Sequence, residues 1–285
     1  MKAKRLDRTA LRQHPIPAVI DGDKETKGRV LIIAGSRDVP GSTLLAATGA
    51  MRAGAGKLRI ATASSIAIQV GIAMPEAMVV GMAEGPDGGF ADSTARELGR
   101  IADEVDAVVA GPGMAEGEAC AKIGVQLLGC DAPLALDAAL LRALQAPPVN
   151  RSVVPILLPH AGELASLLDC EEREIELDPV GCGLRAADRY RSIVLVKGVT
   201  SHIVTPDGKA WTYGGGAPGL GVSGSGDVLA GIVGGLLARG ADPLNGLLWA
   251  VFLHGQAGAV LAKKVGPIGF LARQIADELP GLMPR

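Results

Sequence analysis

Short apolar runs alternate with helix-like segments along most of this 285-residue chain, and that alternation limits the folds open to it. Most of the runs are apolar throughout, as in strands that are buried on both faces of a parallel sheet. The predicted strands are Val30–Ala34, Leu58–Ala61, Ala77–Val80, Ala107–Ala110, Leu134–Leu136, Val153–Leu158 and Ile193–Val196. The predicted helices lie near 42–53, 91–104, 117–128, 162–168 and 182–190. This order predicts an α/β fold: a mostly parallel sheet covered by helices on both faces.

Two segments depart from the alternation. Ser201–Thr212 predicts an antiparallel hairpin with a turn at Pro206-Asp207-Gly208. After Asp227 the pattern is helical throughout. No linker or repeat divides the chain, so we expect one domain over residues 1–285, with residues 1–23 as an N-terminal extension.

Composition excludes several functions. The net charge is −2 with no long basic run, which argues against binding to nucleic acid. The four cysteines form no CxxC pair, so we expect free thiols in a reducing cytoplasm and no zinc site. The basic N-terminus lacks the apolar segment of a secretory signal. Residues 243–262 carry no charge, but polar residues interrupt them, which favours a buried core helix over a membrane span.

A glycine-rich loop, Gly224-Ser225-Gly226-Asp227, runs directly into the apolar segment Val228–Val233. A helix that begins here would present unpaired N–H groups and a positive dipole, which suit a phosphate. A carboxylate at this point is more useful as a base or a metal contact than as an anion binder. The alternative is that Asp227 is the N-cap of a buried helix, and the loop alone favours neither interpretation.

Glycine, proline and polar residues follow most of the predicted strands. In open parallel sheets, ligands bind beyond the carboxyl ends of the strands, so these residues should meet in one cleft. The segments are Gly35-Ser36, Gly111–Gly113, Asp137, Pro159–Glu163 and Lys197-Gly198. Together with the loop at 224–227, they predict a cleft for a phosphate-bearing ligand.

Several blocks resemble a known family when taken in order. They are Gly28–Ser36, Arg52–Gly56, Pro75–Val79, Gly111–Met114, Leu158–Glu163, Gly219–Gly231 and Leu253–Gly255. From about Lys24 to Lys264 the chain resembles the NAD(P)H-hydrate dehydratases, ADP- or ATP-dependent repair enzymes of the ribokinase-like superfamily. The resemblance implies a three-layer α/β/α fold, often in tetramers, and the dehydratase domain without an epimerase domain. It implies that hydrated NADH or NADPH loses water at the expense of ADP or ATP, with Mg²⁺.

The resemblance also implies roles for individual residues. Asp227 would be the catalytic base and an anchor for the substrate hydroxyl. The nucleotide would contact Lys197, Gly198, Val199, Thr200, Ser201, Gly224, Ser225 and Gly226. The substrate would contact Ser42, Gly113, His160 and Glu163 as well as Asp227. Asp137 or Glu163 could hold Mg²⁺ through water.

Each of these residues has a plainer interpretation. Lys197 could be a lysine on a solvated turn at the edge of the sheet, and His160 could cap the helix that starts near Gly162. Glu163 could be a first-turn carboxylate favoured by the helix dipole. His254, on the apolar helix, is more typical of a core histidine than of a ligand.

The chain departs from the family pattern at Ser42, Ala139, Ala161 and Ala217, around the expected substrate pocket. Two other functions therefore stay open: a kinase for a small hydroxylated metabolite, and a nucleotide-binding regulator without turnover. Sugar kinases of this superfamily usually carry a lid of strands near the N-terminus. Residues 1–28 show no alternating strand pair of that kind.

Overall fold

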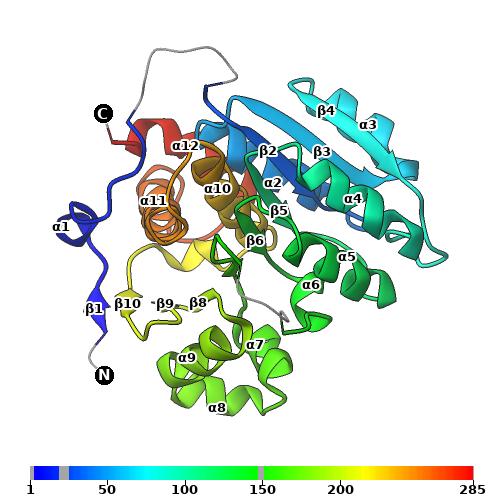
Figure 1. Cartoon of the computed structure of the whole chain (residues 1–285). Helices are drawn as coiled ribbons and strands as arrows, with labels where there is room; N and C mark the ends of the chain where they lie inside the picture. Colours follow the sequence, from blue (N-terminus) through cyan, green and yellow to red (C-terminus); the bar gives the residue numbers. More distant parts are fainter. Residues whose placement is uncertain (1–2, 19–25, 147–150, 285) are drawn as a thin grey trace.

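A ten-stranded sheet forms the centre of the protein, with helices on both faces (Figure 1). This is a computed structural model, and it describes residues 3–18, 26–146 and 151–284. The strands are β1 (Lys4–Arg5), β2 (Arg29–Ile33), β3 (Lys57–Ala63), β4 (Ala77–Met82), β5 (Ala107–Ala110), β6 (Leu134–Leu136), β7 (Ile156–Leu157), β8 (Ile193–Val196), β9 (Ser201–Val204) and β10 (Ala210–Tyr213). Their order across the sheet is β1-β10-β9-β8-β7-β6-β5-β2-β3-β4.

The sheet is parallel from β8 to β4, and only β9 among the described strands runs against its neighbours. From β2 the chain continues to β3 and β4 on one side, and from β5 it continues to β6, β7 and β8 on the other. The strand order therefore reverses between β2 and β5. Ligand sites in such sheets lie at the carboxyl ends of the strands beside this reversal.

Two helical layers cover the sheet. One contains α2 (Gly41–Arg52), α3 (Ala67–Ala73), α10 (Ser225–Ala238), α11 (Pro243–Lys264) and α12 (Ala272–Leu282). The other contains α4 (Ala95–Ala102), α5 (Glu118–Leu128), α6 (Ala139–Arg142), α7 (Ala161–Leu168), α8 (Glu172–Leu177) and α9 (Pro179–Tyr190). Successive residues of a strand point to opposite faces. Accordingly Val30 and Ile32 join the first core, while Leu31 and Ile33 join the second.

Helices α2 and α10 pack with almost no side chain between them. A Cβ at Gly231 would lie 2.0 Å from the carbonyl oxygen of Ala46, and one at Gly235 would lie 2.3 Å from that of Ala50. Only glycine permits this approach. The chain is rich in glycine and contains 2% aromatic residues, so its core relies on close backbone contact. The contact fixes the position of α10 against α2, and the glycine-rich loop lies at the start of α10.

The predicted strands and the hairpin are present, with one strand shortened. The run Val153–Leu158 pairs as a strand only over β7, Ile156–Leu157. Pro155 has no N–H to donate to a neighbouring strand, which ends the pairing on that side. Helix α9 starts earlier than predicted, at Pro179, because Asp178 caps it by accepting from the Gly181 N–H at 2.8 Å. The short helices α1 (Arg8–Leu11), α3, α6 and α8 were not predicted.

The N-terminal segment is part of the fold. Leu6 and Leu11 are buried, β1 pairs with β10, and the carbonyl of His14 accepts a hydrogen bond from Trp249 Nε1 at 2.7 Å. Residues 1, 2 and 19–23 of the predicted extension lie outside the described residues. Among the described residues before β2 there is one two-residue strand and no strand pair.

Helix α11 has the length and apolar composition of a membrane span. Most of it is buried inside the protein, however, and Leu247, Leu248 and Leu253 belong to the core shared with α10 and α12. It is therefore a core helix in this structure, as predicted.

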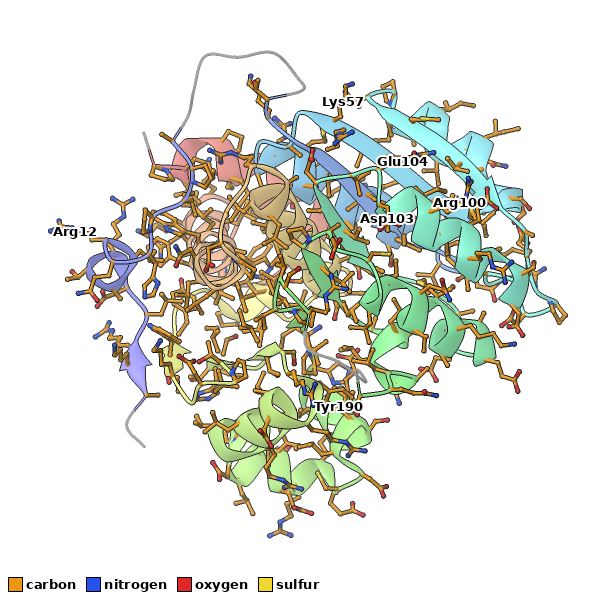
Figure 2. All side chains as sticks on the ribbon, in the orientation of Figure 1. Arg12, Lys57, Arg100, Asp103, Glu104 and Tyr190 are labelled. Atoms are coloured by element: carbon orange, nitrogen blue, oxygen red, sulfur yellow. The ribbon has the colours of Figure 1, made fainter. Side chains whose placement is uncertain are left out.

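Many charged residues lie on the outside of these layers, whereas Asp137 and Glu163 are buried. Arg12, Arg100 and Glu104, which are labelled in Figure 2, are all exposed. Tyr190 is buried instead, and its hydroxyl donates to the Leu167 carbonyl at 3.0 Å, which joins α9 to α7. All four cysteines are free thiols, as predicted.

Candidate active site

The residues that follow the parallel strands meet at one edge of the sheet. The N–H of Gly35 donates to the carbonyl of Pro112 at 2.8 Å, which joins the ends of β2 and β5. Gly111 has φ +122, and a Cβ there would lie 1.8 Å from the carbonyl oxygen of Asp137, at the end of β6. The N–H of Lys197 donates to Pro159 O at 2.8 Å, which joins β8 to β7. The predicted gathering of strand ends is therefore confirmed.

Lys197 points inward to two carboxylates and not into a solvated turn, so the plainer interpretation was wrong. Its Nζ lies 2.7 Å from Asp137 Oδ1 and 3.7 Å from Glu163 Oε2, and the three side chains are 19%, 3% and 8% exposed. Burial raises the pKa of Asp137 to about 6 against the opposing charge of Lys197. Burial alone would lower the pKa of Lys197, but the two carboxylates outweigh it and the pKa is raised.

His160 caps α7, as its plainer interpretation predicted. Its Nδ1 accepts from the N–H groups of Gly162 and Glu163, at 3.1 and 3.4 Å, and Glu163 Oε2 accepts from the N–H of His160 at 2.8 Å. This is a capping box with histidine in the N-cap position. Because Nδ1 accepts, a neutral His160 carries its hydrogen on Nε2. Its ring is half exposed, so the cap leaves it accessible to a ligand.

Asp227 lies in the first turn of α10 and is not its N-cap. That position belongs to Gly224, with φ +86, where a Cβ would lie 2.3 Å from Leu45 Cδ1. Burial raises the pKa of Asp227, while a hydrogen bond from the Ser42 side chain and the charge of Lys197 oppose the rise. Gly113 packs closely against the same serine, because a Cβ at Gly113 would lie 2.6 Å from Ser42 Cβ. Asp227, Ser42 and Gly113 therefore form one wall.

A cavity of about 820 Å³ joins the two segments predicted to hold a nucleotide. Its lining residues come from the end of β8, from β10 and the loop after it, and from the start of α10 and the middle of α11. They are His160, Lys197, Gly198, Val199, Ser201, Tyr213, Gly214, Gly215, Gly216, Ala217, Pro218, Leu220, Gly221, Val222, Ser225, Gly226, Leu229, Val251, His254 and Gly255. Thr200 and Gly224 adjoin lining residues in the chain. A Cβ at Gly226 would lie 3.7 Å from Lys197 Nζ, so the ammonium sits beside the N-terminus of α10.

Two lining residues lie outside the segments predicted to contact the nucleotide. Ala217 lines this cavity together with the glycine-rich loop, although it was assigned to the substrate side. His254 lines it as well, and its Nε2 lies 3.0 Å from Ser225 Oγ. The pattern of α11 gave no signal for this contact, because His254 and Ser225 are 29 positions apart.

The carboxylates do not form a ready metal site. Among the described residues, no group of three or more His, Cys, Asp or Glu side chains could hold a metal ion. Asp137 and Glu163 already face the ammonium of Lys197, which supplies the positive charge between them.

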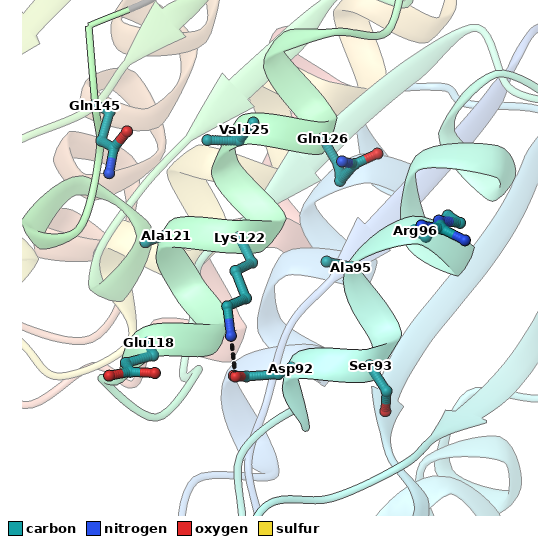
Figure 3. Close-up of a pocket in the computed structure, with 10 residues that line it drawn as sticks. All are labelled: Asp92, Ser93, Ala95, Arg96, Glu118, Ala121, Lys122, Val125, Gln126 and Gln145. Carbon is teal, nitrogen blue, oxygen red and sulfur yellow. Dashed lines mark hydrogen bonds and ion pairs between the residues drawn. The ribbon is translucent and has the colours of Figure 1, made fainter.

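A second hollow, of about 710 Å³, lies between α4 and α5 (Figure 3). Its side chains include the ion pair of Lys122 with Asp92, and none of the predicted site residues lines it. We therefore place the candidate active site in the cavity beside α10.

The fold therefore has a parallel sheet between two helical layers, with a glycine-rich helix start beside a cavity at the carboxyl edge of the sheet, and its structural neighbours are ribokinase-like. A ribokinase-like superfamily protein from Enterococcus faecalis has the same fold, with a TM-score of 0.82 at 24% identity, over 98% of this chain and 95% of that one.

The family model for NAD(P)H-hydrate dehydratase matches residues 30–281. The chain is 46% identical over 279 residues to the ADP-dependent (S)-NAD(P)H-hydrate dehydratase of Xanthomonas campestris, a match that covers 97% of this chain and 94% of that protein. The ADP/ATP-dependent NAD(P)H-hydrate dehydratase of Bacillus subtilis, co-crystallised with ATP/Mg²⁺, gives a TM-score of 0.88 at 29% identity, over 99% and 98% of the two chains. This chain belongs to the NAD(P)H-hydrate dehydratase family.

Proposed function

We propose that this chain removes water from hydrated NADH or NADPH at the expense of ADP or ATP, with Asp227 as the general base. The observation that carries the proposal is the position of Asp227. It lies between Ser42 and Lys197 in the first turn of α10, directly after Ser225 and Gly226, which line the cavity. A hydroxyl of the substrate that reaches Asp227 would therefore lie beside the phosphates of a nucleotide in that cavity.

The proposed reaction has two stages. Asp227 takes the proton of the hydrate hydroxyl, whose oxygen attacks the terminal phosphoryl group, and the bond from that group to the rest of the nucleotide breaks. The C–O bond to the phosphate then breaks, and phosphate, a far better leaving group than hydroxide, departs. The neighbouring ring carbon gives up a proton to solvent, and the C=C bond that forms restores the dihydronicotinamide. Backbone N–H groups at the start of α10 and the ammonium of Lys197 would stabilise the charge on the transferring group.

Both nucleotides are included because they present the same inner phosphates to the loop. The relative from Xanthomonas campestris is named ADP-dependent and the one from Bacillus subtilis ADP/ATP-dependent. Magnesium would arrive with the nucleotide and help to neutralise its phosphates. Since Asp137 and Glu163 pair with Lys197, any contact from either to the ion would run through water.

The test follows the absorbance of dihydronicotinamide as it returns from hydrated NADH and, separately, hydrated NADPH, with ADP or with ATP. Asp227→Asn should abolish turnover while the fold and the nucleotide affinity stay close to wild type. Asp207→Asn, in the exposed hairpin turn, is the matched control and should keep full activity. Normal turnover in Asp227→Asn would remove Asp227 from the mechanism.

The same assay separates the alternatives. Nucleotide consumption with a hydroxylated metabolite, and none with the hydrates, would indicate a small-molecule kinase. Nucleotide binding without any turnover would indicate a regulator. We further propose a cytoplasmic homo-oligomer, with a tetramer as the expected state, which light scattering after gel filtration would measure.

A further inference from the structure

His254 is a polar side chain on a largely apolar helix, and it touches the start of α10. Its Nε2 lies 3.0 Å from Ser225 Oγ and 3.1 Å from the backbone carbonyl oxygen of Ser225. Ser225 is the first residue of α10, and both residues line the cavity. One ring nitrogen therefore contacts both the side chain and the backbone of Ser225, in the cavity that is proposed to bind the nucleotide.

The two contacts determine where the hydrogens lie. A carbonyl oxygen only accepts, so Nε2 must carry a hydrogen, and the neutral ring then has none on Nδ1. The ring is neutral because burial lowers the pKa of His254 to about 4. The charge of Lys197 acts in the same direction. The same N–H lies within reach of Ser225 Oγ, which accepts from it and keeps its own O–H as a donor.

Helix α11, which carries His254, packs closely against Tyr213 of β10. A Cβ at Gly255 would lie 2.3 Å from the ring of Tyr213, and Gln256 Nε2 donates to the Tyr213 hydroxyl at 3.3 Å. The neighbours of His254 on both sides in the chain are therefore packed, since Leu253 is fully buried. The imidazole has little freedom to leave Ser225.

We propose that His254 is a positioning residue: it donates from Nε2 to Ser225 and so directs the Ser225 O–H toward a phosphate of the bound nucleotide. The proposal rests on the proposed function, in which the nucleotide binds in this cavity. A hydroxyl that is already oriented makes a charge-assisted hydrogen bond to a phosphate without first losing its rotational freedom.

The test is a double-mutant cycle, with the Kd of ADP and of ATP measured by calorimetry and kcat/KM measured in the dehydration assay. Ser225→Ala and His254→Phe should each raise the Kd of the nucleotide about tenfold to a hundredfold. This is the effect expected from losing one hydrogen bond to a charged group. In the Ser225→Ala background, His254→Phe should cost at most a few-fold. His254→Gln, whose amide N–H can replace the Nε2 donor, should recover most of the affinity.

His202→Phe is the matched control, because burial also lowers the pKa of His202 but its ring lies near Thr212 on β10 and does not line the cavity. It should leave the Kd unchanged. Equal losses from His254→Phe in the wild-type and Ser225→Ala backgrounds, or no rescue by glutamine in a folded variant, would overturn the proposal. A wild-type protein that binds neither nucleotide would instead overturn the proposal that this cavity binds ADP or ATP. If His254→Phe does not fold, His254→Leu takes its place in the cycle as the variant without a donor, and it must lose affinity while His254→Gln keeps it.

Discussion

Lys197→Met should destabilise the protein strongly, because it removes the cation from a buried pair of carboxylates. Methionine keeps the length and the apolar stem of lysine, so packing changes little. Asp137, which is 3% exposed, and Glu163, which is 8% exposed, then face each other without the ammonium that lies 2.7 and 3.7 Å from them. Breaking a buried ion pair by removing one partner costs about 3–5 kcal/mol of the free energy of unfolding.

The expected loss depends on pH. Burial already raises the pKa of Asp137 to about 6, against an ordinary value of 3.8, and Lys197 is the group that opposes the rise. Without Lys197 the pKa in the folded state moves higher still. The folded variant then binds a proton that the unfolded chain releases, so its free energy of unfolding increases as pH falls toward 4. The gap to wild type should be widest at pH 8 and should narrow by pH 5.5.

The assay is urea unfolding followed by circular dichroism at both pH values. Adding Asp137→Asn to Lys197→Met removes the stranded charge and should recover most of the lost stability. Lys264→Met is the control, because the ion pair of Lys264 with Glu278 involves a lysine that is 61% exposed and should be worth about 0–1 kcal/mol. A loss below about 1 kcal/mol in Lys197→Met, or an equal loss at both pH values, would refute the reasoning.

Two further predictions concern the same edge of the sheet. Ser42→Ala removes the hydrogen bond that lowers the pKa of Asp227, so the acid limb of the pH–kcat profile should move to higher pH. The control is Thr48→Ala, on the same helix, which should leave the acid limb in place. An unmoved acid limb in Ser42→Ala would count against Asp227 as the base. Gly111→Ala should cost at least about 3 kcal/mol in urea unfolding, from its left-handed backbone and the collision with Asp137. Gly240 also has a positive φ, +88, but an added Cβ there would have nothing within 4 Å. Gly240→Ala should therefore lose only the part of the stability that comes from backbone strain. Equal losses at the two glycines would contradict the packing argument.

The order of strands and helices could be predicted well because it follows from local patterns. Strands such as Ala107–Ala110 and Ile193–Val196 have the predicted bounds. Patterns were weakest where a segment was short or partly exposed: α3 carries Ile68 and Ile72, which are 76% and 77% exposed, and it lacks a clear apolar stripe. The strand at Val153–Leu158 was overextended because apolar composition outweighed the missing N–H of Pro155.

Sequence alone determined that the ends of the parallel strands meet, because parallel strands with crossover helices place all their carboxyl ends at one edge. It therefore predicted the segments of the candidate site, including the helix start at Gly224–Asp227. The direction of each side chain became clear only from the three-dimensional packing: Lys197 faces Asp137 instead of solvent, Gly224 takes the cap position instead of Asp227, and His254 reaches Ser225. These outcomes depend on burial and on contacts between residues far apart in the chain, and no local pattern carries that information.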